Sequence, residues 1–102
     1  MSEPTVFTLA ICLFPVVTAS DFVGPLELFS FLYPETLATG LFGTSSYAIK
    51  PTFLSIDKNP VRTSSAFTIV PTKTYEETKS EQYDILLVPG GEFMLFVRFG
   101  LF

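Results

Sequence analysis

The residues best suited to chemistry in this 102-residue chain lie in two turns, each of which follows an apolar run. Asp21 follows the run over residues 6–17, and the pair Gly90 and Gly91 follows the run over residues 85–88. Consecutive glycines let backbone approach a ligand closely, and their amides can stabilise a developing oxyanion. A carboxylate on the opposite wall could position a proton or hold a neighbouring thiol in its reactive state. The plainer alternatives are a helix cap for Asp21 and an ordinary turn for the glycines.

The other reactive side chains exclude several kinds of site. Cys12 is the only cysteine and there is no histidine, so a Ser–His–Asp or Cys–His arrangement cannot form within the chain. The same absences leave no cysteine and histidine cluster for zinc and no internal disulfide, and we expect no metal and no cofactor. Because Cys12 lies inside an apolar run, we interpret it as an inert core thiol. A single unpaired cysteine favours a reducing compartment, and we expect a cytoplasmic protein.

Three elements must position the two turns. Residues 6–17 form a nearly continuous apolar run, which is typical of a strand buried on both faces of a parallel sheet. Residues 21–33 carry an apolar stripe with helical spacing, and Pro34 ends the predicted helix. Residues 83–88 form the second core strand. Ligands bind at the carboxyl ends of strands in such sheets, so we expect the Asp21 turn and the double-glycine turn to face each other across one crevice.

The remaining segments complete an open α/β sheet. Residues 47–56 read as a strand that Pro51 weakens, and residues 61–70 as a small hairpin around Ser64 and Ser65. Residues 35–46 read as a loop with room for a short helical turn, and residues 74–82 as an exposed short helix or loop. The order strand, helix, strand, hairpin, strand predicts a mostly parallel sheet with right-handed crossovers.

Charge and hydropathy argue against two classes of partner. The net charge is −4, and none of the six lysines and arginines precedes Lys50, so we expect no binding to nucleic acid. No uncharged apolar stretch reaches the ~20 residues that a membrane span needs. Residues 5–17 resemble the core of a signal peptide, but Glu3 and the lack of a preceding basic residue oppose that interpretation.

Five segments together resemble the opening of the ThiJ/PfpI superfamily, a group with the class I glutamine-amidotransferase-like, flavodoxin-like fold. They are residues 11–15 (ICLFP), 21–29 (DFVGPLELF), 60–65 (PVRTSS), 67–71 (FTIVP) and 83–91 (YDILLVPGG). The resemblance is nearest to the isonitrile-hydratase-like branch. It implies that residues 1–91 are the N-terminal part of such a domain and that residues 92–102 are a divergent, Phe-rich tail.

The resemblance also implies roles for matching residues. Asp21 matches the acidic residue that hydrogen-bonds the family's reactive cysteine, and Gly90 and Gly91 match the turn whose backbone lines the oxyanion site. Glu27 matches a recurrent acidic position of the first helix. The family's cysteine lies on a strand-to-helix elbow beyond the double glycine, and we expect Cys12 to be no substitute because it sits in mid-strand. Ala66 stands where relatives often have glycine.

Three functional hypotheses follow. The first is a truncated domain from a cofactor-free cysteine hydratase or hydrolase lineage that acts on a small-molecule substrate, inactive here without its elbow cysteine. The second is a non-catalytic ligand-sensing module, like those at the front of AraC-type regulators. The third is a fragment without a function of its own, which forms homo-oligomers or self-associates through an unpaired sheet edge.

Overall fold

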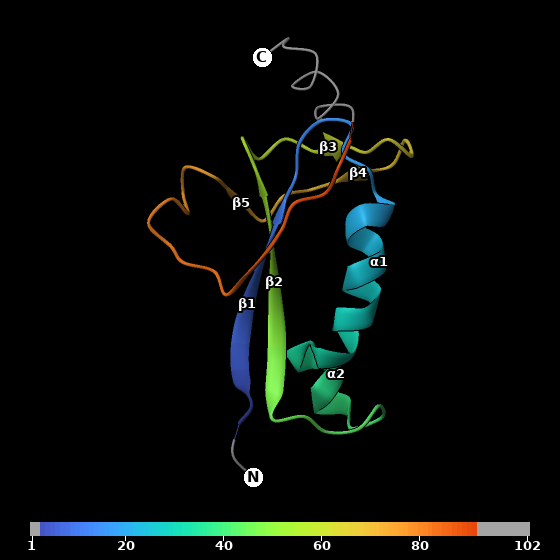
Figure 1. Cartoon of the computed structure of the whole chain (residues 1–102), viewed down its shortest axis with the longest axis vertical. Helices are drawn as coiled ribbons and strands as arrows, with labels where there is room; N and C mark the ends of the chain where they lie inside the picture. Colours follow the sequence, from blue (N-terminus) through green and yellow to red (C-terminus); the bar gives the residue numbers. More distant parts are fainter. Residues whose placement is uncertain (1–2, 92–102) are drawn as a thin grey trace.

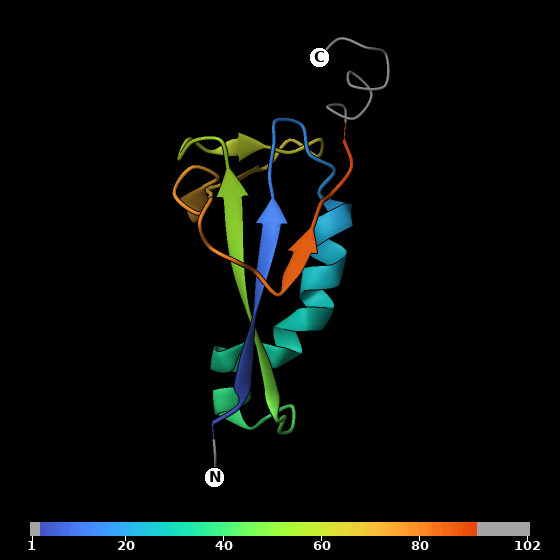
Figure 2. The same cartoon turned by 60° about the vertical axis from the view of Figure 1, so that its left-hand side comes forward.

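The computed structural model of the protein describes residues 3–91, and its centre is a four-stranded parallel sheet. The strands are β1 (Thr5–Cys12), β2 (Tyr47–Ser55), β5 (Lys73–Thr74) and β6 (Ile85–Leu87), in the order β5-β2-β1-β6. All three pairings are parallel. The carboxyl ends of β1, β2 and β6 therefore point the same way, as Figure 2 shows. The predicted α/β, mostly parallel sheet is confirmed.

The core lies between β1 and the first helix. Leu9 and Ile11 of β1 and Leu13 just after it alternate and are fully buried, and they cluster with Phe22 of the helix. Ala10 is also fully buried, although alternation places it on the opposite face. The continuous apolar run thus marks a strand covered on both sides, as its composition predicts.

The strand β1 ends earlier than predicted, because residues 14–17 form a turn. The Val17 amide donates a hydrogen bond to the Phe14 carbonyl at 3.1 Å. Pro15 takes the second position of this turn, and Val16 takes the third with a φ of 63°. Proline followed by a positive φ is the arrangement of a type II β-turn, in which glycine is usual at the third position.

The helical segment differs from the single predicted helix over residues 21–33. It comprises α1 (Ser20–Phe29), a 3₁₀ turn η1 (Ser30–Leu32) and α2 (Pro34–Thr39). Figure 1 shows α1 running alongside the strands and α2 turning across their lower ends. Pro34 begins α2 rather than only ending the first helix, because proline suits the first helical position. The segment predicted as a loop therefore does hold a short helix.

The predicted hairpin is confirmed as β3 (Val61–Arg62) paired with β4 (Thr68–Ile69) in antiparallel register. It is attached to the turn after β1 by two backbone hydrogen bonds. The Val16 amide donates to the Arg62 carbonyl at 2.8 Å, and the Ser64 amide donates to the Val17 carbonyl at 2.9 Å. The hairpin consequently lies at the carboxyl end of the sheet.

Pro51 lies within β2, and the pairing of that strand explains why it is tolerated. The Phe53 amide and carbonyl face the β5 side, where both bond to Thr72 at 3.2 and 2.7 Å. Strand orientation repeats every second residue, so Pro51 also faces that side. The pairing with β5 involves only Leu54 and Ser55 of β2, and the missing amide of Pro51 therefore removes no bond of the sheet.

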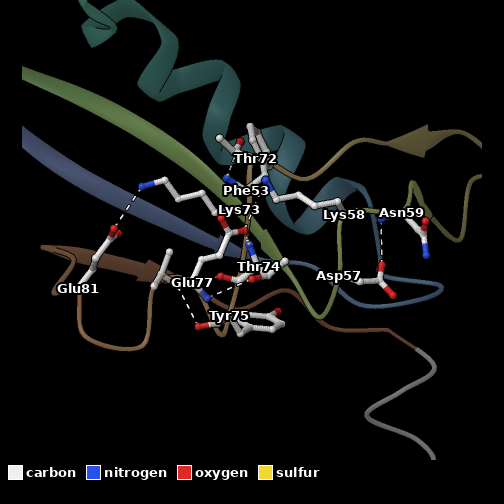
Figure 3. Close-up of polar contacts among 11 residues, drawn as sticks. Phe53, Asp57, Lys58, Asn59, Thr72, Lys73, Thr74, Tyr75, Glu77 and Glu81 are labelled. Carbon is white, nitrogen blue, oxygen red and sulfur yellow. Dashed lines mark hydrogen bonds and ion pairs between the residues drawn. The ribbon is translucent and has the colours of Figure 1, made fainter.

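The segment predicted as an exposed helix or loop over residues 74–82 is a turn that follows the short edge strand β5. Ion pairs join Lys73 to Glu81 at 3.2 Å and Lys58 to Glu77 at 3.5 Å (Figure 3). These side chains are about half exposed, so solvent screens both pairs and they add little to the stability of the fold. The predicted tail over residues 92–102 lies outside the described residues. Within residues 3–91, no helix has both the length and the apolar character needed to cross a membrane.

Candidate active site

Asp21 and Gly90 lie in hydrogen-bond contact, although 68 residues separate them in the chain. The Gly90 amide donates to Asp21 Oδ2 at 2.9 Å, and the Thr18 amide donates to the Gly90 carbonyl at 2.9 Å. The turn after β6 is thus hydrogen-bonded to residues just before and just after the start of α1. The structure therefore brings together the two turns in which the sequence placed its candidate residues, while their catalytic role remains a prediction.

Parallel pairing of β1 with β6 is what places the two turns together. Leu9 pairs with Ile85, and two further pairs follow toward the carboxyl ends. Asp84 fixes the start of this register, because its Oδ2 accepts bonds from the Thr8 amide at 2.8 Å and the Thr8 hydroxyl at 3.1 Å. The Asp84 amide in turn donates to the Thr8 carbonyl at 3.1 Å. Sequence reasoning missed this role, although Asp84 belongs to the segment YDILLVPGG that it singled out.

The Asp21 carboxylate accepts a hydrogen bond from a backbone amide and does not cap the helix. Ala19 occupies the N-cap position of α1 with helical backbone angles, and no side chain caps the helix there. The alternative interpretation of Asp21 as a helix cap is therefore wrong. The Asp21 carboxylate lies in the first turn of α1, where the helix dipole favours a negative charge, and its residue remains exposed to solvent.

Close approach of backbone requires a glycine at position 91, whereas the contact at Gly90 is with a side chain. A Cβ on Gly91 would lie 2.8 Å from the Val16 carbonyl oxygen and 3.1 Å from the Phe14 ring. A Cβ on Gly90 would lie 3.1 Å from Asp21 Oδ2. Because the Gly90 amide donates to Asp21, it positions that carboxylate. The oxyanion role expected for Gly90 and Gly91 stays a prediction.

Val16 adds backbone strain beside the same turn. Its φ of 63° lies in the left-handed region, where a β-branched residue is an outlier that costs of order 1–2 kcal/mol. Its carbonyl oxygen is the atom closest to the missing Cβ of Gly91. This strain could not be predicted, because a Pro-Val-Val run inside an apolar segment is typical of a strand.

Cys12 does not lie in mid-strand as predicted, since it is the last residue of β1 and is only half-buried. Alternation directs its side chain to the face opposite Ile11 and Leu13, away from α1. Burial raises the pKa of Cys12, and a hydrogen bond with the Tyr75 hydroxyl lowers it in part. Cys12 is thus a neutral thiol at pH 7, which agrees with the predicted inert character although not with the predicted position.

Tyr75 is a second residue that sequence reasoning missed. Its hydroxyl donates to the Leu13 carbonyl at 2.8 Å and therefore closes the carboxyl end of β1 on the face opposite α1. Burial, followed by the influence of Cys12, raises the pKa of Tyr75 to about 12. Within residues 3–91, no group of three or more histidine, cysteine, aspartate or glutamate side chains is placed to hold a metal ion.

Comparison with known proteins gives the family. The sequence profile described as the DJ-1/PfpI family matches residues 8–94. The chain therefore belongs to the DJ-1/PfpI family, which confirms the resemblance to the ThiJ/PfpI superfamily. No curated protein matches the chain.

Solved structures agree with this assignment. A ThiJ/PfpI family protein from Pseudomonas syringae is 25% identical, with a TM-score of 0.65 over 86% of this chain and 30% of its own. DJ-1beta from Drosophila melanogaster is 20% identical, with a TM-score of 0.59 over 89% of this chain and 39% of its own. An AraC family transcriptional regulator from Pseudomonas putida is 19% identical, with a TM-score of 0.59 over 83% and 47%. The chain spans less than half the length of each, and the latter two show the fold alone.

Proposed function

We propose that this chain supplies the carboxylate-bearing half of a cysteine-dependent hydratase or hydrolase site of the isonitrile-hydratase-like branch. The observation that carries the proposal is the 2.9 Å hydrogen bond from the Gly90 amide to Asp21 Oδ2. It leaves the second carboxylate oxygen, Oδ1, available to a reacting group. Asp21 would accept the proton of a thiol or hold that thiol in position.

The proposed reaction would use a thiol as the nucleophile and water as the second reactant. A thiol adds across an isonitrile so that sulfur bonds to the terminal carbon and the proton moves to that same carbon, which gives a thioimidate. Water then attacks this carbon and the C–S bond breaks, so that a substituted formamide and the free thiol are formed. Gly91 would stabilise negative charge that develops during the attack of water.

Cys12 is not the thiol of this proposal. Its side chain lies on the face opposite α1, and its raised pKa keeps it protonated at neutral pH. As Cys12 is the only cysteine in the 102 residues, the reacting thiol would be supplied by sequence outside them, as on the elbow of family members. The 102-residue chain alone should then show no turnover.

A chimera tests the proposal directly. Residues 8–91 replace the matched segment of an isonitrile-hydrating family member, and the product N-cyclohexylformamide is measured from cyclohexyl isonitrile. We expect the chimera to be active, Asp21→Asn to lower kcat by about 100-fold, and Cys12→Ser to change it little. Turnover by the isolated chain, or full activity of the Asp21→Asn chimera, would overturn the proposal.

A non-catalytic sensing module is the second candidate. The fold match to the AraC family regulator favours it. Such a module would bind a small molecule at the same carboxyl edge without transforming it. Sensing would be supported over catalysis if the unsubstituted chimera never turned the substrate over while its Asp21→Asn variant still bound that substrate.

We also propose self-association through β6. This strand lies at the edge of the described sheet, and its residue Leu86 and the following Val88 are 64% and 60% exposed. An unpaired edge with apolar side chains favours pairing with another chain. Sedimentation should show oligomers that dissociate in a Leu86→Lys variant, and a monomeric parent protein would contradict this.

A further inference from the structure

A cavity of about 250 Å³ lies between α1, β2 and the β3–β4 hairpin, and its lining is unusually aromatic. Four of the lining residues are aromatic, namely Phe22, Tyr33, Phe53 and Phe67, and Glu27 is the one ionisable residue of the lining besides Tyr33. We propose that this cavity binds a small organic cation of the substituted ammonium class. Neither Asp21 nor Gly90 lines it, so the inference goes beyond the proposed function and does not depend on it.

The four rings are arranged from the core to the surface. Phe22 is 1% exposed and belongs to the buried core, whereas Phe67 is 45% exposed at the hairpin. Phe53 and Tyr33 are half-buried between them, and the Tyr33 hydroxyl donates to the Leu26 carbonyl at 3.4 Å. The face of an aromatic ring carries negative charge density that attracts a cation within ~6 Å. Several rings around one volume therefore favour an ammonium group that can lose its weakly held water.

The charges around the cavity have the matching sign. Glu27 brings a carboxylate to the wall, and no lysine or arginine lines the cavity. Burial raises the pKa of Tyr33, and the negative charges of Glu27 and Glu35 raise it further, so their field reaches this ring. The chain as a whole carries a net charge of −4, which attracts cations at long range.

The occupant follows from the combination of rings and one carboxylate. A hydrated metal ion would need several oxygen ligands, and the wall offers mainly carbon. A neutral apolar molecule would fill the volume but would gain nothing from Glu27. An organic cation uses both features, because its alkyl groups contact the rings while its charge faces the carboxylate.

A pair of nearly isosteric ligands tests the proposal. Choline and 3,3-dimethylbutan-1-ol have almost the same shape, but only choline carries a charge. Calorimetric or NMR titration of the full chain should show choline binding about tenfold more tightly than the alcohol. Equal affinities, or no saturable binding of choline in the millimolar range, would overturn the proposal.

Two variants locate the binding. Glu27→Gln should lower the affinity for choline about fivefold, and Phe67→Leu, which removes a ring at an exposed position, should lower it by a similar factor. The control Glu76→Gln removes an exposed carboxylate from the turn after β5, outside this cavity, and should leave choline binding unchanged. Thermal melts show whether each variant is folded. If Glu27→Gln and Phe67→Leu both bind choline like the parent, the proposed cavity is wrong.

Discussion

At the carboxyl end of β1, the α1 side of the sheet holds a carboxylate and the opposite side holds a thiol. Asp21 is exposed and accepts a hydrogen bond from the Gly90 amide at 2.9 Å. Cys12 is half-buried beside Tyr75, and burial keeps its pKa above the usual range. The backbone thus supports charge on one side, while burial suppresses charge on the other. The two sides therefore differ in whether they stabilise a charged or a neutral side chain. Four substitutions test the contacts at this end of the sheet.

The largest effect is expected at Gly91. Gly91→Ala would place a Cβ 2.8 Å from the Val16 carbonyl oxygen, a backbone atom that cannot move without disturbing the strained turn. We expect a loss of about 2–3 kcal/mol in the free energy of unfolding, measured by urea titration. The control is Gly24→Ala in α1, where the added Cβ meets nothing within 4 Å. That substitution should stabilise the protein by about 0.5–1 kcal/mol, and a similar loss in both variants would contradict the close-approach argument.

This difference between glycines also marks what sequence can and cannot predict. The pattern of apolar residues predicted β1, α1, the hairpin and β6, because each buries a recognisable face. The meeting of the Asp21 and Gly90 turns followed from topology, since parallel neighbours end at one edge. That Gly91 tolerates no side chain and Gly24 does depends on contacts with the distant turn at residues 14–17.

Local sequence patterns could not predict two other features, for the same physical reason. Lys73 and Thr74 form β5 by pairing with Leu54 and Ser55, and two residues, of which lysine disfavours strands, give too short a local pattern to predict it. The early end of β1 depends on the hairpin, whose Arg62 carbonyl accepts the Val16 amide. Long-range backbone hydrogen bonds therefore decided the points on which the sequence was silent or wrong.

The second effect is expected at Asp21. Asp21→Ala leaves the Gly90 amide without its carboxylate acceptor, and a hydrogen bond of this kind at an exposed site is worth about 1 kcal/mol. Urea titration should show a loss of that size, and amide exchange at Gly90 should become faster. The control Glu76→Ala removes a carboxylate whose ion pair with Lys79 is largely exposed, and it should change stability by less than ~0.5 kcal/mol. Unchanged exchange at Gly90 would show that Asp21 does not hold this turn in solution.

The third effect is a change in pH dependence on the opposite side of the sheet. Tyr75 has a pKa near 10 when unfolded and about 12 when folded, so its protonated form is favoured by folding. The resulting stability is fully present below pH 10 and is lost as the pH rises toward 12. The raised pKa of Cys12 adds a loss that begins near pH 9. Tyr75→Phe should therefore flatten the alkaline fall in melting temperature, although it lowers stability at pH 7 by about 1 kcal/mol.

A tyrosine with a different environment provides the comparison for this experiment. Burial raises the pKa of Tyr83 as well, and a hydrogen bond that its hydroxyl donates to the exposed Glu81 carboxylate at 2.9 Å raises it further. Solvent weakens such a pair, so Tyr83→Phe should flatten the alkaline fall less than Tyr75→Phe does. If the two variants respond alike between pH 9 and 12, burial beside Cys12 is not the cause of the Tyr75 shift.

The smallest effect is a gain in stability in the hairpin that adjoins the site. Ala66 has a φ of 73°, in the left-handed region that glycine adopts without steric cost. Ala66→Gly relieves this strain but gives the unfolded chain more freedom, so we expect a net gain of about 0.5 kcal/mol. The control Ala38→Gly lies in α2 and should instead destabilise by about 1 kcal/mol, because helical backbone favours alanine. Opposite signs in thermal melts would show that strain in this hairpin is local to the turn, whereas a loss in both variants would mean that the left-handed conformation at Ala66 carries no strain to relieve.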